Sequence, residues 1–198
     1  ENGTRLLCQS MERANIRRLC FYSSVAVFGD GVGGPEQYSD VGRLPVNPYG
    51  ASKFAAEAEC MRWWSAASDR KLLIVRPVVT FGEGHFANVF LLLRQLHNRL
   101  YVPVGPGTNR KSLAFVQNLV DATLFAWDRT VDGTRFEFNY ADQPDLSSGE
   151  LEVALRRLLG QGPSRLRIPI GVALALAAPL DLFVRLTNVS LSINTARI

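Results

Sequence analysis

The first part of the chain alternates between helical and strand patterns. Between residues 4 and 14, apolar positions recur at helical spacing with charges between them, which predicts an amphipathic helix. A continuous apolar run follows at 19–22, as in a buried strand, and it stops at Ser23 and Ser24. The glycine-rich stretch at 29–34 then predicts a loop.

A second helix and strand are predicted at 49–67 and 72–75. Asn47 is a favourable N-cap, Pro48 suits the first helical position, and the run that follows is rich in Ala and Glu. The apolar run at 72–75 is typical of a parallel strand covered on both faces. The same patterns predict helices at 86–96, 117–129 and 148–159, strands at 113–116 and 136–140, and a turn at 105–109.

This alternation of helices and strands favours an α/β fold. We expect part of a Rossmann-like, doubly wound parallel sheet, followed by a small C-terminal α/β region. In such sheets ligands bind at the carboxyl ends of the strands. Ser24 and the pair Arg76-Pro77 follow two predicted strands directly, so candidate functional residues gather at this edge.

Composition narrows the class of protein. The 198 residues are 47% hydrophobic and carry a net charge of +4, which fits one globular domain and excludes a disordered or collagen-like chain. Three cysteines without a CxxC pair, and two histidines, indicate neither a disulfide framework nor a metal site. The sequence has no basic stripe of the kind that binds nucleic acid. We expect the cysteines to act as small hydrophobic residues and His85 and His97 to lie at the surface.

The segment 168–186 is strongly apolar. Its longest uncharged run, 168–180, has 13 residues and contains two prolines, whereas a membrane helix needs about 20. We therefore expect no transmembrane span and predict one or two buried helices here. Packing over a substrate cleft is favoured over contact with a membrane surface. Trp63 and Trp64 are expected in the core and at a subunit interface.

Tyr49 and Lys53 form the clearest chemical pattern. Four positions apart on the predicted helix, they share one face, where the ammonium stabilises the phenolate and the pair can act as acid and base. Such pairs also arise by chance. Ser24 precedes Tyr49 by 25 residues and brings a hydroxyl to the same sheet edge, although taken by itself it is more typical of a cap at the strand end.

Four segments together resemble the extended short-chain dehydrogenase/reductases, in particular the NAD-dependent epimerase/dehydratase family acting on nucleotide sugars. The resemblance covers roughly residues 1–140. The segments, in chain order, are FYSSVAVFG, PVNPYGASK, RPVVTFGEG and GPGTNRKSLAFVQNLVDA. The order and spacing of the four are far more specific than any single motif.

The resemblance implies a role for each matching residue. Tyr49 would be the catalytic acid/base, and Lys53 would hold the nicotinamide ribose. Ser24, beside Val25, would hydrogen-bond the reacting sugar hydroxyl. The remaining matches would line the nicotinamide (Pro77, Val78, Val79), meet the nucleotide (Asn88, Val89) and face the diphosphate (Arg110, Lys111). For the last two groups, a polar helix start and an ordinary exposed turn are the competing interpretations.

The chain departs from the family pattern in two ways. No glycine-rich dinucleotide motif follows a strand, so the family's first βαβ unit has no counterpart. We expect residues 1–80 to be the C-terminal part of an NAD(P)-binding domain, residues 81–198 to be mostly substrate-binding with interleaved Rossmann elements, and the whole to be a fragment of a longer protein. In addition, Val25 and Ala26 stand where dehydratases of the family carry carboxylates, which disfavours elimination chemistry.

The resemblance therefore implies an NAD-dependent nucleotide-sugar epimerase. Its substrate would be a sugar joined to a nucleoside diphosphate, most readily UDP, and its cofactor NAD, with NADP left open. It would be a cytoplasmic homodimer paired through the first helix and the Tyr49 helix. The alternatives are a relative of the 3-beta-hydroxysteroid dehydrogenases and a non-catalytic NAD(P)-binding scaffold or sensor.

Overall fold

The computed structural model describes residues 2–29, 45–164 and 166–175. The chain divides into two units. The first unit comprises Glu1–Gly84 and Ser112–Gln143, and the second comprises His85–Lys111 and Pro144–Ile198. The glycine-rich loop predicted at 29–34 lies outside the described residues, apart from Gly29.

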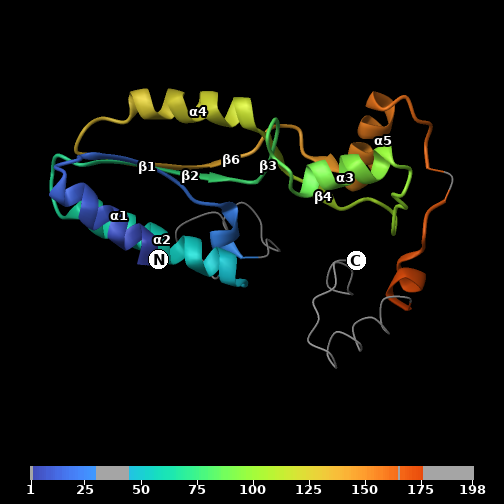
Figure 1. The fold of residues 1–198 in the computed structure, drawn as a ribbon, viewed down its shortest axis with the longest axis horizontal. Coiled ribbons are helices and arrows are strands. Elements are labelled where there is room, and N and C mark those ends of the chain that lie inside the picture. Colours follow the sequence, from blue (N-terminus) through green and yellow to red (C-terminus); the bar gives the residue numbers. More distant parts are fainter. Residues whose placement is uncertain (1, 30–44, 165, 176–198) are drawn as a thin grey trace. The chain divides into compact units, whose positions relative to one another are not determined.

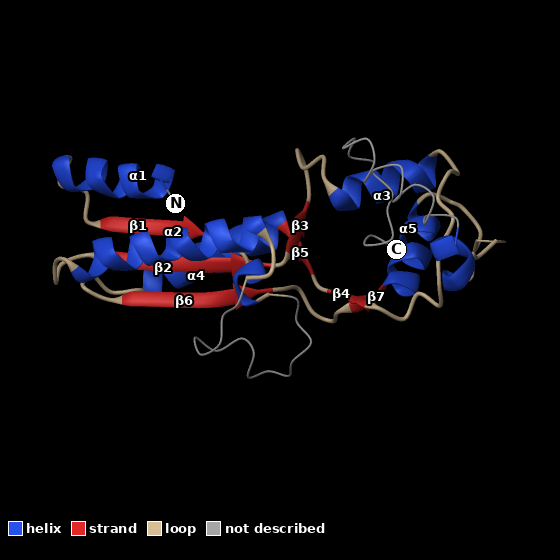
Figure 2. Ribbon diagram, turned by 90° about the horizontal axis from the view of Figure 1, so that it is seen from below, coloured by secondary structure: helices blue, strands red, loops and turns tan. Residues whose placement is uncertain are grey.

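A three-stranded parallel sheet is the centre of the first unit (Figure 2). Its strands are β1 (Arg18–Tyr22), β2 (Lys71–Pro77) and β6 (Arg135–Tyr140), in the order β1-β2-β6. Cys20 pairs with Leu73, and Leu73 pairs with Phe136. The predicted parallel α/β sheet is confirmed.

Helices cover both faces of this sheet. Helices α1 (Asn2–Arg13) and α2 (Pro48–Ser65) lie on one face, and α4 (Val116–Arg129) lies on the other (Figure 1). The helices predicted from periodicity at 4–14, 49–67 and 117–129 therefore form, with ends that differ by one or two residues.

The apolar run of β2 is explained by this double cover. Leu72 and Ile74 pack on the α1/α2 face, while Leu73 and Val75 pack on the α4 face, and all four are fully buried. Successive side chains of a strand point to opposite faces, so a strand covered on both sides has no exposed position. The partners on the α1/α2 face are Cys8, Met11, Leu19, Cys60 and Trp63.

Two of these core residues are the cysteines of α1 and α2. Cys8 and Cys60 are buried and interact through their thiols. Burial, followed by the neighbouring Cys8, raises the pKa of Cys60 to about 12, so the thiol stays protonated at neutral pH. These two cysteines behave as the small hydrophobic residues expected from the sequence. His85 and His97 are exposed, as predicted.

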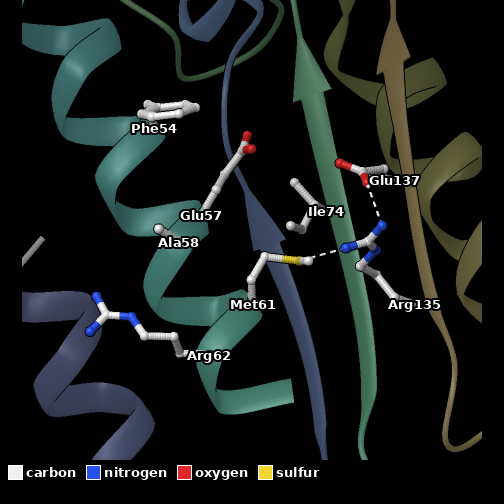
Figure 3. A pocket seen from close by; sticks show the side chains of 8 residues that line it. All are labelled: Phe54, Glu57, Ala58, Met61, Arg62, Ile74, Arg135 and Glu137. Carbon is white, nitrogen blue, oxygen red and sulfur yellow. Dashed lines mark hydrogen bonds and ion pairs between the residues drawn. The ribbon is translucent and has the colours of Figure 1, made fainter. Parts of the chain in front are cut away.

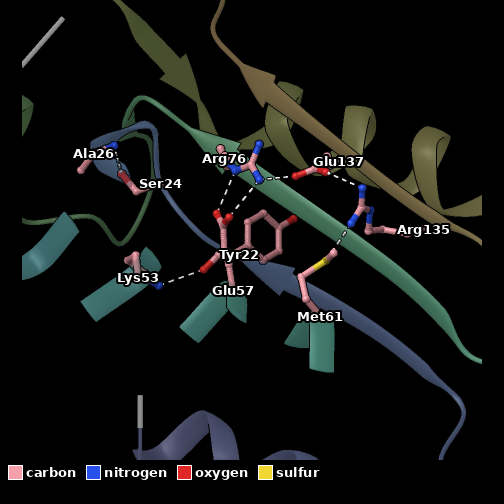
Figure 4. Close-up of polar contacts among 9 residues, drawn as sticks. All are labelled: Tyr22, Ser24, Ala26, Lys53, Glu57, Met61, Arg76, Arg135 and Glu137. Carbon is pink, nitrogen blue, oxygen red and sulfur yellow. Dashed lines mark hydrogen bonds and ion pairs between the residues drawn. The ribbon is translucent and has the colours of Figure 1, made fainter. Parts of the chain in front are cut away.

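A buried ion pair joins α2 to the sheet. The guanidinium of Arg76 donates from Nε to Glu57 Oε1 (2.8 Å) and from Nη2 to Glu57 Oε2 (2.9 Å), and it also donates to Glu137 of β6 (Figure 4). The Arg76 and Glu57 side chains are each 4% exposed. Burial opposes the charge on Arg76, but the hydrogen bonds and charges of Glu57 and Glu137 outweigh it and raise the pKa of the guanidinium.

A close backbone contact fixes the start of α2. The 3₁₀ helix η1 (Val25–Phe28) follows β1, and a Cβ placed on Gly50 would lie 2.3 Å from the Ala26 carbonyl oxygen. Only a residue without a side chain allows this approach. The first turn of α2 therefore rests directly on the main chain of η1.

Two short strands complete the first unit; the one at 113–115 confirms a prediction from the sequence, and the one at 79–81 was not predicted. Strand β3 (Val79–Phe81) pairs in parallel with β5 (Leu113–Phe115). A three-residue strand shows too little alternation to be recognised by periodicity, which explains why β3 was missed.

The described part of the second unit includes two helices of ten or more residues and a short antiparallel strand pair. Helix α3 (Asn88–His97) and helix α5 (Ser148–Leu158) confirm the predicted helices. Strand β4 (Arg110–Lys111) pairs antiparallel with β7 (Leu146–Ser147). Ser147 and Glu150 form a capping box at the start of α5.

The apolar segment that begins at residue 168 differs from the prediction. Residues 170–175 are helical, but Ile170, Val172 and Leu174 are 52%, 50% and 40% exposed, and only Ala173 is buried. The prediction of a buried helix is therefore wrong for residues 170–175. Residues 176–186 lie outside the described part of the chain.

The ion pair of Arg76 generates the first prediction. In Glu57→Gln the guanidinium loses its bidentate charged partner while remaining buried, so the free energy of unfolding should fall by about 2–3 kcal/mol. Urea denaturation measures this change. Asp132→Asn is the matched control, because Asp132 forms an exposed ion pair with Arg18 and its loss should leave the midpoint nearly unchanged. Equal shifts in the two variants would contradict the assigned role of Glu57.

The close approach at Gly50 generates the second prediction. Gly50→Ala should destabilise the chain by about 1–3 kcal/mol, because η1 must move away from the new methyl group. The control is Gly3→Ala in α1, where a Cβ meets nothing within 4 Å. That substitution should stabilise by about 0.5–1 kcal/mol through helix propensity alone. Thermal melts of both variants test the opposite signs.

Candidate active site

Ser24 lies immediately after β1, at the carboxyl edge of the sheet. It is the N-cap of η1, and its Oγ accepts a hydrogen bond from the Ala26 backbone N–H at 3.2 Å (Figure 4). The side chain is half-buried. Ser24 thus has the capping contact considered in the sequence analysis, and its hydroxyl also stands at the edge where ligands of parallel sheets bind.

Tyr49 lies in the first turn of α2, directly after Pro48. The side chain of Asn47 accepts a hydrogen bond from the Gly50 backbone N–H at 2.8 Å, which confirms the predicted N-cap. The Tyr49 side chain is 56% exposed. The cap and the close contact of Gly50 with η1 hold this turn beside the turn of Ser24.

Lys53 follows one turn later and is held by main-chain contact. Its Nζ donates a hydrogen bond to the Tyr22 carbonyl oxygen at 2.8 Å (Figure 4). The same nitrogen lies 6.0 Å from the centre of the Tyr49 ring. The Phe21 ring is 5.3 Å from the same nitrogen. The Lys53 ammonium is thus bonded to the end of β1 and lies near the rings of both Phe21 and Tyr49.

The residues after β2 lie at the same edge. The backbone N–H of Ser23 donates to the Val75 carbonyl (2.8 Å), which ties the end of β1 to β2. Pro77 ends β2, and the Val78 N–H donates to the Tyr140 carbonyl (3.1 Å). Val79 is partly exposed at the start of β3.

Two residues at this edge were missed as site residues by the sequence analysis. Tyr22 supplies the carbonyl that holds Lys53, and its hydroxyl donates to Thr123 Oγ1 at 2.8 Å. Ser23 is 4% exposed, and its Oγ has no hydrogen-bond partner among the described residues. A sequence pattern cannot indicate which backbone carbonyl will bind a side chain, so the role of Tyr22 could not be predicted. The two consecutive serines could have indicated that Ser23 also lies at the carboxyl edge of the sheet.

The other predicted site residues belong to the second unit. Asn88 is the first residue of α3, followed by Val89, and Arg110 and Lys111 are exposed in β4. Arg110 donates from Nη1 to the Asp145 carbonyl oxygen at 2.8 Å. It also lines a cavity of about 630 Å³ together with Arg157 and the start of α5. The structure thus gathers Ser24, Tyr49 and Lys53 in one unit and the four substrate candidates in the other.

A second cavity, of about 530 Å³, lies in the first unit between α2 and β6 (Figure 3). Its lining consists of Phe54, Glu57, Ala58, Met61, Arg62, Ile74, Arg135 and Glu137. None of the predicted site residues lines it. Its carboxylates belong to the network of Arg76, so this cavity borders the structural ion pair rather than the candidate acid/base group.

The donor set at the sheet edge fits one end of NAD. The Lys53 ammonium and the Tyr49 hydroxyl can donate hydrogen bonds to ribose hydroxyls, and the apolar residues 77–79 can lie against a flat ring. A glycine-rich turn from a strand into a helix is the arrangement that holds a dinucleotide pyrophosphate, and none of β1, β2 and β6 has it among the described residues. Strand β3 does lead into α3 through Gly82 and Gly84, but it belongs to a separate two-stranded sheet with β5. The described residues therefore fit the nicotinamide ribose and provide no cradle for the pyrophosphate.

Neither a metal-binding cluster nor a membrane-spanning helix occurs among the described residues. They contain no cluster of three or more His, Cys, Asp or Glu side chains able to hold a metal ion. None of their helices has both the length and the apolar character needed to cross a membrane.

Several proteins of similar sequence are named as sugar epimerases. The N-acetyl-alpha-D-glucosaminyl-diphospho-ditrans,octacis-undecaprenol 4-epimerase of Escherichia coli O157:H7 is 31% identical over 197 residues, covering 99% of this chain and 59% of that protein. The UDP-glucose 4-epimerase of Vibrio cholerae is 30% identical over 171 residues, covering 85% of this chain and 51% of that protein. This chain therefore spans little more than half the length of these curated relatives.

Solved structures share the fold. The UDP-glucuronic acid 4-epimerase of Bacillus cereus, in complex with NAD, has a TM-score of 0.68 at 17% identity and covers 84% of this chain and 54% of its own. The UDP-N-acetylglucosamine 4-epimerase of Methanobrevibacter ruminantium M1 has a TM-score of 0.66 at 19% identity, with coverage of 85% and 54%.

The family model agrees with the motifs quoted from the sequence. The model of the NAD dependent epimerase/dehydratase family matches residues 1–139, which include β1, η1, α2, β2 and the residues Ser24, Tyr49 and Lys53. Together with the parallel sheet and the relatives described above, this match shows that the chain belongs to the NAD dependent epimerase/dehydratase family.

Proposed function

We propose that this chain supplies the acid/base group and the substrate-binding unit of an NAD-dependent epimerase acting on a sugar carried by a diphosphate. The observation that carries the proposal is the position of the Lys53 ammonium, hydrogen-bonded to the Tyr22 carbonyl and 6.0 Å from the Tyr49 ring. A cation held beside a phenol at the carboxyl edge of a parallel sheet is suited to proton transfer.

In the proposed reaction, Lys53 stabilises the phenolate of Tyr49, which takes the proton from a sugar hydroxyl and becomes the neutral phenol. Ser24 orients the same hydroxyl through a hydrogen bond. NAD, when bound, accepts the hydride from the sugar carbon and returns it. After the keto sugar turns its other face to the site, Tyr49 gives the proton back, and the configuration at that carbon is inverted.

The proposed binding contacts follow the two units. Pro77, Val78 and Val79 would line the nicotinamide, since they follow β2 at the edge shared with Ser24. In the second unit, we assign the nucleotide to Asn88 and Val89 and the diphosphate to Arg110 and Lys111. Both cations of β4 are exposed and Arg110 lines a cavity, which supports this assignment.

Two kinds of group could carry the sugar through the diphosphate: a nucleoside, as in UDP, and a polyprenol. UDP is the carrier named for several relatives and is the one expected from the sequence, in a cytoplasmic enzyme. The Escherichia coli relative acts on a sugar joined through a diphosphate to undecaprenol. Both carriers share the sugar-diphosphate portion, so the proposed roles of Arg110 and Lys111 hold for either.

We also propose that the protein pairs as a homodimer through α1 and α2. Leu6 and Leu7 of α1 and Phe54 of α2 are large apolar residues exposed on these helices. Covering them would remove apolar area from water.

Substitution of Leu6 tests the dimer. Leu6→Glu should convert a dimer to a monomer in sedimentation equilibrium, because a charge would be buried at the interface. Leu124→Glu, at an equally exposed position on α4, should leave the dimer intact. A monomeric unsubstituted chain would refute the proposed pairing.

Turnover tests the role of Tyr49. The test uses a fusion in which a glycine-rich βαβ unit of a family member, about 100 residues long, precedes this chain and completes the dinucleotide site. We call this fusion the extended protein. In this protein Tyr49→Phe should lower kcat for a UDP-sugar by about 10²–10⁴-fold, as expected for loss of an acid/base group. Tyr101→Phe, in the second unit, is the control and should retain activity. Undiminished turnover in Tyr49→Phe would overturn the assignment.

Calorimetric titration tests the cofactor and carrier separately. NAD should bind only to the extended protein, because the described chain has no pyrophosphate cradle, whereas UDP should bind to both forms. If the extended protein binds neither ligand, the epimerase proposal fails, and a steroid-like substrate or a non-catalytic scaffold becomes the better interpretation.

A further inference from the structure

The second unit exposes a continuous apolar surface beside its C-terminal described helix. Ile170 and Leu174 lie one turn apart on the same side of this helix, so they form one exposed strip. The Ile170 side chain is 3.9 Å from the point that a Cβ on Gly105 would occupy, which places the strip against the segment 101–105.

Two extended segments continue this surface. Val104 is bridged in parallel to Ile168, and the Gly105 N–H donates to the Ile168 carbonyl (2.9 Å). Along 102–105 exposed and buried residues alternate, so Val102 and Val104 point to the same, exposed side. Leu166 and Val102 line one hollow. We call this set the apolar surface; it consists of Val102, Val104, Leu166, Ile170 and Leu174.

Cations surround the apolar surface. Arg99 lines the same hollow as Val102 and Leu166, and Arg167 is bonded to the Gly105 carbonyl through Nη1 (2.8 Å). Arg157 is exposed in the neighbouring cavity of Arg110. Of the acidic residues nearby, Glu152 is buried against Arg156, and its second oxygen pairs with Arg167 at 3.6 Å, which offsets part of the charge of Arg167. Glu150 is held in the capping box of α5.

The sequence separates charge between the two units. The second unit has ten Lys and Arg against four Asp and Glu, a net charge of +6, while the first unit has twelve against fourteen, a net charge of −2. Residues 85–111 contain four Lys and Arg and no Asp or Glu. The positive charge of the whole chain thus lies in the unit that exposes the apolar surface.

We infer that the apolar surface docks the second unit on an anionic lipid bilayer. An exposed apolar helix flanked by arginines places its apolar residues at the boundary of headgroups and acyl chains, while the cations contact anionic headgroups. Arg110, proposed above to face the diphosphate, lies in the same unit and at the end of the turn 105–110 that starts beside Ile170. A substrate diphosphate anchored in the bilayer by a polyprenyl chain would then reach this unit from the membrane.

Only the identity of the substrate rests on the proposed function; the docking itself does not. Co-sedimentation of the chain with vesicles therefore tests the inference without NAD or sugar. We expect binding to vesicles of phosphatidylcholine and phosphatidylglycerol in equal amounts, and at least about fivefold weaker binding to phosphatidylcholine alone, because each cation near an anionic surface contributes about a fivefold factor. Sodium chloride at about 0.5 M should weaken the anionic binding by screening.

Variants separate the apolar and electrostatic contributions. The double variant Ile170→Glu with Leu174→Glu should bind anionic vesicles more weakly by about tenfold or more. The reason is that two apolar side chains that would be buried in the bilayer are replaced by charged ones. The control Leu124→Glu, on α4 of the first unit, should bind as the unsubstituted chain does. Arg99→Gln with Arg157→Gln keeps the apolar surface and should reduce the preference for anionic over neutral vesicles. Circular dichroism confirms that each variant is folded.

Each outcome decides the inference. No binding to anionic vesicles, equal binding to neutral and anionic vesicles, or an equal loss in Leu124→Glu would overturn it. If docking fails while the extended protein still turns over a UDP-sugar, the membrane inference falls and the proposed function stands. If docking is found and Tyr49→Phe leaves turnover unchanged, the proposed function falls and the docking stands.

Discussion

The pairing of Arg76 with Glu57 is the constraint on which the arrangement of the first unit depends. A guanidinium and a carboxylate buried together must meet in one geometry, because neither can recover its lost hydration elsewhere. Glu57 is one turn beyond Lys53 on α2, and Arg76 is the penultimate residue of β2. The pair therefore sets both the rotation and the axial position of the helix that carries Tyr49, and Glu137 extends this restraint to β6.

This restraint acts together with contacts at the other end of α2. The Asn47 cap fixes where the helix begins, and Lys53 ties it to the Tyr22 carbonyl. The phenol of Tyr49 is exposed, so its own packing contributes little to the fold. Its placement is instead imposed by neighbours that are buried or bonded to main chain, as expected for the acid/base role proposed above.

Much of this arrangement could be predicted from the sequence because it is local. The Asn47 cap and Pro48 mark a helix start, and a short apolar run such as 72–75 has few alternatives in an α/β chain. The pairing of Arg76 with Glu57 could not be predicted, since 19 residues separate them and many other charges could have paired. The exposed helix at 170–175 was predicted wrongly for a different reason. Buried residues are usually apolar, but an apolar residue is not necessarily buried.

The contact between Gly50 and Ala26 has a consequence for protein engineering. Exchanging the segment after β1 for that of another family member is an obvious way to alter substrate choice, and the exchanged segment would have to reproduce the main-chain path at Ala26. The steric limit is set by the backbone rather than by any side chain, so conventional side-chain repacking would not relieve a mismatch. Loop exchange at this site is therefore best designed with η1 and the first turn of α2 transferred as one piece.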